Sequence, residues 1–412
     1  MKNTLLCATM VMILSCGFAL GQVTEKLLYS FGPLPDAQGG GGSPLVSDHA
    51  GNLYGVASNG GSQNGGVVFE LSPSGDGTWS ETVLYSFCYY TQNCPEGTSP
   101  VGITIDSAGN LFGATAEGGN GNGSLYGSGV VFELSPPSAP GGVWSYSVVY
   151  DFCSLSNCVD GLFPYAPPTL DESGNLYGTT FEGPGYGGPG IVYELSPSLM
   201  GWNETVLYTF CTLSNCTDGA DPATGLAFDK MGSLYGTTTY GGTKTGKFGG
   251  GGTLFKLSPG LSGWTETTLV NFPRIRGNKS LFGQPSLDPL GDVYTTFSVP
   301  DQIDGAVVQV KRDGATKAFN FNGTDGSNPL TGVIVDSKRG VVYGTVEYSD
   351  ADRCGGVFQI SASGESLLYD FCQYSGDAAG PGGLLEDASG NLYGWSAGGG
   401  AYGYGAVFEI TP

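Results

Sequence analysis

Three short motifs recur in a fixed order along almost the whole chain, and this recurrence constrains the fold more than any other feature. The motifs resemble Gly-Asn-Leu-Tyr-Gly, Val-Phe-Glu-Leu and Leu-Tyr-Ser-Phe. The first motif begins at seven glycines, at intervals of 49 to 65 residues: Gly51, Gly109, Gly174, Gly232, Gly291, Gly340 and Gly390. Repeats of this length are typical of solenoids and propellers.

Each repeat predicts four short strands, here called a, b, c and d. Strand a ends at an Asp just before the first motif, and the three motifs form strands b, c and d. Apolar residues lie on both faces of strands c and d, so both faces must be buried. Gly, Pro, Asn and Ser separate the strands. Seven such sheets around an axis form a β-propeller; an open β-solenoid is the alternative, although its repeats are usually shorter.

The two ends of the chain predict a closed ring. The chain opens on a third motif, Leu28-Tyr29-Ser30-Phe31, with no a, b or c strand before it, and it stops after a second motif with no d strand. We therefore expect an all-β, seven-bladed β-propeller of four-stranded blades, closed by the N-terminal strand 26–31 completing the last blade, which removes the open edges. The expected blades span approximately 43–87, 99–152, 164–210, 222–272, 285–321, 328–371 and 380–412.

Residues 1–21 have the pattern of a secretory signal peptide. Lys2 is followed by the apolar stretch 5–14, and Ala19-Leu20-Gly21 forms a small-x-small cleavage site before Gln22. We therefore expect an exported protein, secreted or held at the cell surface. The alternative is a lipoprotein signal with Cys16 lipidated.

The eight remaining cysteines favour disulfides. Six form local pairs, in which each first Cys follows a third motif: Cys88 with Cys94, Cys153 with Cys158, and Cys211 with Cys216. Metal binding is the alternative, but no pair has Cys-x-x-Cys spacing and the chain has one His.

A fourth disulfide is predicted between Cys354 and Cys372, across strands c and d of blade 6. In the expected antiparallel register Ile360 lies opposite Ser366 and Val357 opposite Tyr369. Continuing that register places the two cysteines opposite each other, close enough to bridge.

Composition excludes several classes of function. The net charge of −22 argues against a nucleic-acid partner. Beyond Leu20 no apolar run is long enough to cross a bilayer, so we expect no transmembrane segment in the mature chain. One His leaves little room for His-based catalysis, and we expect no cofactor. A monomer is assumed.

Two acidic motifs predict turns rather than metal sites. An Asp precedes each first motif, where its carboxylate and the following Gly suit a hairpin turn; a ring of metal ligands is the alternative. Acid-Gly-x-x-Pro recurs at Glu96, Asp160, Asp218 and Asp325, each leading into strand a. A turn is again favoured, with a Ca²⁺ site as the alternative. The Gly-x-Gly-x-x-Gly match at Gly185 is of the kind that chance produces in a chain with 73 Gly.

The combined motifs resemble the GloVer tandem-repeat family. They are Asp-x-x-Gly-Asn-Leu-Tyr-Gly, a Gly-rich loop, Gly-x-Val-Phe-x-Leu and Thr-Val-Leu-Tyr-Ser-Phe, and the resemblance covers nearly all of residues 26–412. Members of that family are exported bacterial repeat proteins, also described as choice-of-anchor proteins. The resemblance implies an extracellular or surface-associated propeller, but no reaction. Many members carry a C-terminal anchor, whereas this chain ends on a strand.

The long Gly-rich connections predict where a ligand binds. In a propeller the d–a and b–c connections emerge on one face, here called the loop-rich face; the a–b and c–d turns emerge on the other, the tight-turn face. Variable loops on a rigid scaffold commonly bind ligands. We predict a non-catalytic module for a glycan or protein partner, whose candidate binding residues are Tyr126, Tyr186, Tyr240, Phe248, Tyr348, Trp395, Tyr402 and Tyr404.

Three other interpretations remain open at this stage. These rings could instead pack against their own loops. The protein could be a hydrolase or lyase acting on polysaccharide, which needs carboxylates; Glu117, Glu182, Glu347 and Asp350 are on loop positions, but no pair is marked, and no catalytic residue is assigned. It could also be a structural envelope protein.

Overall fold

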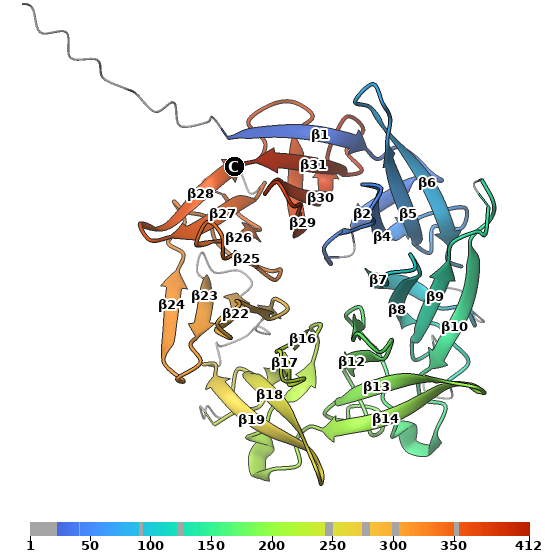
Figure 1. The fold of residues 1–412 in the computed structure, drawn as a ribbon, viewed down its shortest axis with the longest axis vertical. Coiled ribbons are helices and arrows are strands. Elements are labelled where there is room, and N and C mark those ends of the chain that lie inside the picture. Colours follow the sequence, from blue (N-terminus) through green and yellow to red (C-terminus); the bar gives the residue numbers. More distant parts are fainter. Residues whose placement is uncertain are drawn as a thin grey trace, which may run out of the picture.

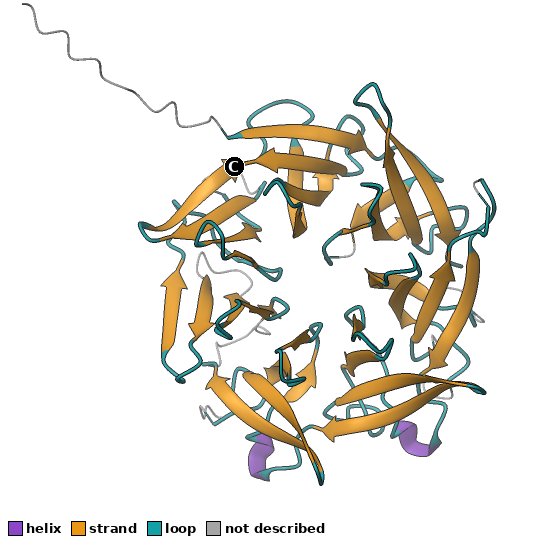
Figure 2. Ribbon diagram, viewed as in Figure 1, coloured by secondary structure: helices purple, strands orange, loops and turns teal. Residues whose placement is uncertain are grey.

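The chain folds into a ring of antiparallel sheets around a central axis (Figure 1). The computed structural model describes residues 23–40, 42–89, 94–121, 127–139, 141–243, 250–273, 281–298, 305–349 and 354–412. Within these residues there are seven sheets, and Figure 2 shows them as seven blades. The predicted signal segment lies outside the described residues.

In each blade the strands follow one another from the axis outwards, and in blades 1, 4 and 5 strand a consists of two pieces. Those of blades 1 to 4 are β2 (Ala37–Gly40) with β3 (Val46–Ser47), β4 (Leu53–Gly60), β5 (Val67–Pro73) and β6 (Trp79–Ser86); β7 (Thr98–Ile105), β8 (Leu111–Glu117), β9 (Val130–Ser135) and β10 (Ser145–Asp151); β11 (Thr169–Leu170), β12 (Leu176–Thr180), β13 (Ile191–Ser198) and β14 (Gly201–Thr209); β15 (Ala220–Pro222) with β16 (Ala227–Phe228), β17 (Leu234–Tyr240), β18 (Thr253–Gly260) and β19 (Gly263–Asn271).

Those of blades 5 to 7 are β20 (Leu281–Phe282) with β21 (Ser286–Leu287), β22 (Val293–Ser298), β23 (Gly305–Val310) and β24 (Thr316–Asn320); β25 (Ile334–Asp336), β26 (Val341–Val346), β27 (Gly356–Ser361) and β28 (Gly364–Asp370); β29 (Ala378–Glu386), β30 (Leu392–Gly399), β31 (Ala406–Thr411) and β1 (Thr24–Ser30). Two 3₁₀ turns, η1 (Ser156–Cys158) and η2 (Ser214–Cys216), lie in d–a connections. No helix in the described part of the chain could span a membrane.

The N-terminal strand closes the ring. Strand β1 pairs antiparallel with β31, with Thr24 opposite Thr411 and Ser30 opposite Ala406. In Figure 1 the blue first strand lies beside the red last one. Blade 7 therefore takes its outer strand from the opposite end of the chain, which confirms the predicted closure.

Aromatic rings join neighbouring blades. The last Phe of a third motif packs on the ring of the second motif in the next blade: Phe87 lies 5.3 Å from Phe132 and Phe371 lies 4.9 Å from Phe408, between ring centroids. Each such pair contributes about 0.5–1.5 kcal/mol beyond the area it buries. Blade 5 has Val308 in place of the second-motif Phe, and there Phe272 stacks on Phe297 at 5.1 Å.

The aspartates before the first motifs form turns, as predicted. Asp48 Oδ1 accepts hydrogen bonds from the N–H groups of Ala50 and Asn52, both at 2.9 Å. Its Oδ2 accepts from Asn52 Nδ2 at 2.9 Å and from the Tyr54 hydroxyl at 3.0 Å. Gly51 has φ of +86°, which only Gly adopts without strain. The carboxylate is therefore occupied by its own turn.

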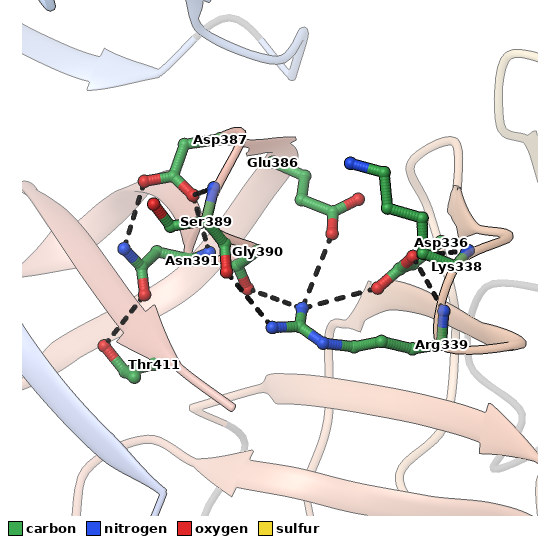
Figure 3. A network of polar contacts seen from close by, with 9 residues as sticks. All are labelled: Asp336, Lys338, Arg339, Glu386, Asp387, Ser389, Gly390, Asn391 and Thr411. Atoms are coloured by element: carbon green, nitrogen blue, oxygen red, sulfur yellow. Dashed lines mark hydrogen bonds and ion pairs between the residues drawn. The ribbon is translucent and has the colours of Figure 1, made fainter.

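The turn before the first motif is one residue longer in blade 6 than in the other blades, and its Arg339 links blade 6 to blade 7. Arg339 donates to the carbonyl oxygens of Gly390 and Ser389, both at 3.1 Å, and forms ion pairs with Asp336 and Glu386 (Figure 3). Its guanidinium thus binds the tight-turn face of the next blade.

All four predicted disulfides are present: Cys88–Cys94, Cys153–Cys158, Cys211–Cys216 and Cys354–Cys372. The Cα atoms of Cys354 and Cys372 are 5.8 Å apart, a normal separation for a bridge.

The register predicted around the fourth disulfide is correct at one residue pair and wrong at another. Val357 lies opposite Tyr369 as expected, but Ile360 pairs with Glu365 rather than Ser366. The c–d turn is tighter than expected, so strand d has one residue more than the pairing needs. A β-bulge next to Val357 accommodates this extra residue. The same irregularity recurs at the third motif of every blade except blade 5, whose c–d pairing is regular.

Candidate functional site

Blade 3 brings two connections of the loop-rich face together. The segment leading into its strand a and the segment leaving its strand b pair as a short ladder. Leu162 and Glu182 exchange two backbone hydrogen bonds, of 3.0 and 3.1 Å, and Phe181 N–H donates to the Phe163 carbonyl at 2.9 Å. The side chains that these two segments carry are therefore held on fixed backbone.

Four aromatic rings from these segments form a continuous strip, here called the blade-3 strip: Phe163, Tyr165, Phe181 and Tyr186. The ring of Phe163 lies 6.2 Å from Tyr186 and 6.4 Å from Tyr165, nearly parallel to the latter. Tyr165 in turn lies 5.2 Å from Phe181, edge to face. Tyr186 is 55% exposed and Tyr165 is 43% exposed, so the strip presents ring surface to solvent.

Two cavities adjoin the strip, one at Tyr186 and one at Tyr165. One, of about 330 Å³, lies between Tyr186 and the loop closed by the Cys153–Cys158 disulfide. The other, of about 360 Å³, lies at the axis between the inner strands of several blades, and Tyr165 and Trp395 are among its lining residues. The strip therefore connects a pocket beside an outer loop with the axial cavity, and both volumes fall in the range of small-ligand sites.

Two carboxyl groups accompany the strip. Glu182 Oε2 accepts the N–H of Gly187 at 2.8 Å. Burial raises the pKa of Glu117, and its Oε2 has no hydrogen-bond partner among the described residues. Burial, and then the charges of Glu117 and Glu182, raise the pKa of Tyr165. Carboxyl groups from blades 2 and 3 therefore lie near enough to one tyrosine of the strip to raise its pKa.

The acid-Gly-x-x-Pro motifs close the d–a connections. Asp160 is buried, and its Oδ2 accepts from the Tyr150 hydroxyl at 3.1 Å and from Ser154 N–H at 2.9 Å. Asp218 is bonded in the same way by Tyr208 and by residue 212. Hydrogen-bond donors of the protein thus reach the carboxylates of both aspartates. Among the described residues no three His, Cys, Asp or Glu side chains are grouped as metal ligands.

The candidate binding residues are scattered over the ring. Tyr186 belongs to the blade-3 strip. Tyr402 and Tyr404 are 65% and 41% exposed in the b–c connection of blade 7. Tyr240 and Tyr348 are half-buried. Tyr126 and Phe248 lie outside the described residues, as does Asp350.

The structure corrects the placement of Trp395. It lies within strand β30 rather than in a loop, and it is 5% exposed. Its Nε1 donates to the Ser43 carbonyl at 2.7 Å, from blade 7 to blade 1. Thr345 Oγ1, at the same repeat position in blade 6, donates to Gly382 of blade 7 at 3.0 Å. Trp395 therefore makes at the closing junction the bond that Thr345 makes from blade 6 and Thr179 from blade 3.

Sequence reasoning missed Phe163, Tyr165 and Phe181. One signal could have revealed Tyr165: it follows the Pro of acid-Gly-x-x-Pro, where the other three repeats have Val101, Ala223 and Leu330. A large aromatic residue at a position that elsewhere holds an aliphatic one is not needed by the scaffold.

Comparison with known families supports the resemblance seen in the motifs. Residues 240–412 match the family described as the Gloeobacter/Verrucomicrobia repeat. The three motifs described above also occur upstream of the matched region, in blades 1 to 3. A comparison with curated proteins finds no match.

Solved structures share the propeller fold at low identity. A protein from Lactobacillus plantarum has a TM-score of 0.51 at 14% identity, over 92% of this chain and 90% of its own. An oligogalacturonate lyase in complex with manganese has a TM-score of 0.52 at 10% identity, over 94% of this chain and 96% of its own. At such identities the similarity establishes the fold alone.

Proposed function

We propose that the Gloeobacter/Verrucomicrobia repeat propeller is an exported, non-catalytic binding module that recognises a glycan through the blade-3 strip. The observation that carries this proposal is the strip itself: an unbroken row of rings with Tyr165 and Tyr186 exposed, between two cavities. Exposed aromatic groups on rigid loops usually mark an interaction site.

The chemistry of the strip suits a sugar chain. A pyranose has an apolar C–H face that packs on an aromatic ring, and a rim of hydroxyl groups that needs donors and acceptors. Glu182 and the tyrosine hydroxyls supply such groups beside the rings. A protein partner is the other ligand class, but rings in a single row suit a linear chain of sugars better than a broad protein interface.

Export is part of the proposal. Four disulfides are typical of an oxidising compartment, and the N-terminal sequence has the signal pattern described above. We expect N-terminal sequencing of material recovered outside the cytoplasm to begin at Gln22. A mature chain beginning at a lipidated Cys16 would instead show surface anchoring.

A glycan array followed by calorimetry tests the binding proposal. We expect Tyr186→Ala and Tyr165→Ala each to weaken binding of the best glycan about tenfold, which corresponds to about 1.4 kcal/mol. Tyr402→Ala is the matched control, because it removes an exposed tyrosine from blade 7 and should leave binding unchanged. Equal loss in all three variants, or none in the first two, contradicts the proposal.

The second candidate is an enzyme that cleaves polysaccharide. Glu117 favours it, because burial raises the pKa of its carboxyl as a general acid requires, and the charge of a second carboxyl group, Glu182, also raises the pKa of Tyr165. Incubation of the protein with the bound glycan distinguishes the two. Unchanged glycan supports the module, whereas released fragments that disappear in Glu117→Gln support the enzyme.

A further inference from the structure

The tight-turn face departs from its repeat in blades 4 and 5. The third residue of each Asp-x-x-Gly turn contributes an N–H to the Asp carboxylate, and its side chain is small in blades 1, 2, 3 and 7: Ala50, Ala108, Ser173 and Ser389. Blades 4 and 5 have Met231 and Leu290, which make the same bond at 2.9 Å. These two side chains are 81% and 75% exposed. The turn does not require them, and exposed apolar side chains beside each other commonly mark a binding surface.

A cavity of about 570 Å³ is lined by both side chains. Phe228, Leu287 and Val335, from the strands a of blades 4, 5 and 6, supply further apolar lining. Its volume lies within the range of small-molecule sites. The apolar surface there is thus concave and divided among three blades.

Cations gather at this cavity in a chain that is otherwise acidic. Thirteen of the 15 Lys and Arg residues lie within 230–353, and neither 27–229 nor 354–412 contains any. Lys230, Lys256 and Arg312 line the cavity. Asp229 and Asp288 also line the cavity, but Asp229 is paired with Lys256 and Asp288 accepts the N–H groups of its own turn. The remaining cations favour an anion in a protein of net charge −22.

The three cations differ in how far the protein already uses them. Lys256 is paired with Asp229 at 3.2 Å. Lys230 makes one contact of 3.4 Å, to the Pro289 carbonyl, and its side chain is exposed. For the exposed Arg312 side chain, no hydrogen bond or ion pair is found within the described residues. Lys230 and Arg312 therefore have donors to offer a ligand.

A neighbouring cavity, of about 420 Å³, differs from the first in that the protein itself binds its arginine. It lies between blades 6 and 7 and shares Pro289, Val335 and Ser337 with the first. Its Arg339 is bound to two carbonyl groups and two carboxylates of the protein (Figure 3). Arg339 therefore holds two blades together instead of facing a ligand, and the exposed Lys338 is the other cation that lines this cavity.

We propose that the cavity between the turns of blades 4 and 5 binds a small organic anion with an apolar body. The anionic group lies at Lys230 and Arg312, and the apolar body lies between Met231 and Leu290. The site is on the opposite face from the blade-3 strip, so it does not depend on glycan binding.

A pair of fluorescent probes tests the site. The sulfonate 8-anilinonaphthalene-1-sulfonate carries the anion and the apolar body, and N-phenyl-1-naphthylamine is its neutral counterpart. We expect the folded protein to bind the sulfonate, and octanoate but not octanol to displace it. The double variant Lys230→Gln, Arg312→Gln should weaken sulfonate binding about tenfold and leave the neutral probe unaffected. The double variant Met231→Ser, Leu290→Ser should weaken both probes.

The control is Ser389→Ala, at the equivalent turn position of blade 7, which should change neither probe. Because partly unfolded protein also binds the sulfonate, each variant is compared at an unchanged melting temperature and near-ultraviolet circular dichroism. Absence of sulfonate binding, or unchanged affinity in the charge variant, overturns the proposal. Equal displacement by octanol shows a merely apolar pocket and overturns it as well.

Discussion

The aspartates of the tight turns and the glutamates of the outer strands have the same charge but opposite surroundings. At the turns, backbone N–H groups point at the carboxylate, and despite partial burial they lower the pKa of Asp48 and Asp387. At the blade junctions, burial raises the pKa of Glu81, Glu204 and Glu266 to about 7, and a nearby Asp adds to it in each case. The turn carboxylates therefore stabilise the fold in their charged form, whereas the junction carboxyl groups destabilise it when they are charged.

Removing a turn carboxylate should have the largest effect. Asp48→Ala leaves two N–H groups, the Asn52 amide and the Tyr54 hydroxyl without their acceptor. We expect it to lower the free energy of unfolding by about 3 kcal/mol. Denaturant unfolding measures this. Asp76→Ala, in the exposed c–d turn of the same blade, is the control and should cost clearly less; equal losses would remove the distinction.

The junction glutamates should make the protein less stable as pH rises. The pKa of each of these glutamates is higher in the folded than in the unfolded protein. Their contribution to stability is therefore fully present below about pH 4.5 and is lost as pH rises through 7. Asp48 and Asp387 in the turns have a lowered pKa, so their contribution is present above about pH 4 and is lost as pH falls below it. Melting temperatures should therefore peak between these ranges.

Glu204→Gln isolates one junction. It should raise stability at pH 8 by about 1 kcal/mol, a value reduced for the part of the side chain that water still screens, and it should have no effect at pH 4. Glu172→Gln, on an exposed turn, is the matched control. A gain of the same size at both pH values would assign the effect to packing rather than to charge.

Tyr193→Phe should give a smaller gain. Tyr193 lies fully buried at a junction, with a hydroxyl that has no partner in the described residues, where blades 1, 2, 4, 6 and 7 have Phe. Removing the hydroxyl should stabilise the protein by up to about 1 kcal/mol at every pH, since the group is neutral. The reverse change Phe132→Tyr in blade 2 should destabilise it. A loss in Tyr193→Phe would mean that the hydroxyl is bonded in solution.

The fold followed from the sequence because its evidence repeats. Seven copies of each motif give the strands, the turn aspartates and the unmatched third motif at Leu28 that closes the ring. The wrong predictions are local, and they concern positions whose geometry the motifs do not determine. The bulge beside Val357 shifts the register by one residue, and the axial position of Trp395 is visible only when Ser43, 352 residues away, is beside it.

The blade-3 strip was hard to predict for a related reason. Its rings come from two connections, and only the pairing of Leu162 with Glu182 brings Phe163 next to the segment of Phe181 and Tyr186. No periodic pattern encodes that contact. Tyr186 was predicted as a loop aromatic, but not the partners that make it part of a surface.

Hydrogen–deuterium exchange with the best glycan from the array tests the central claim most directly, because it compares the two faces in one experiment. The account predicts slower exchange in 161–187, on the loop-rich face, and no change at 228–231 and 287–291 on the tight-turn face. Protection confined to the tight-turn segments, or unchanged exchange throughout 161–187 at saturating glycan, would contradict it.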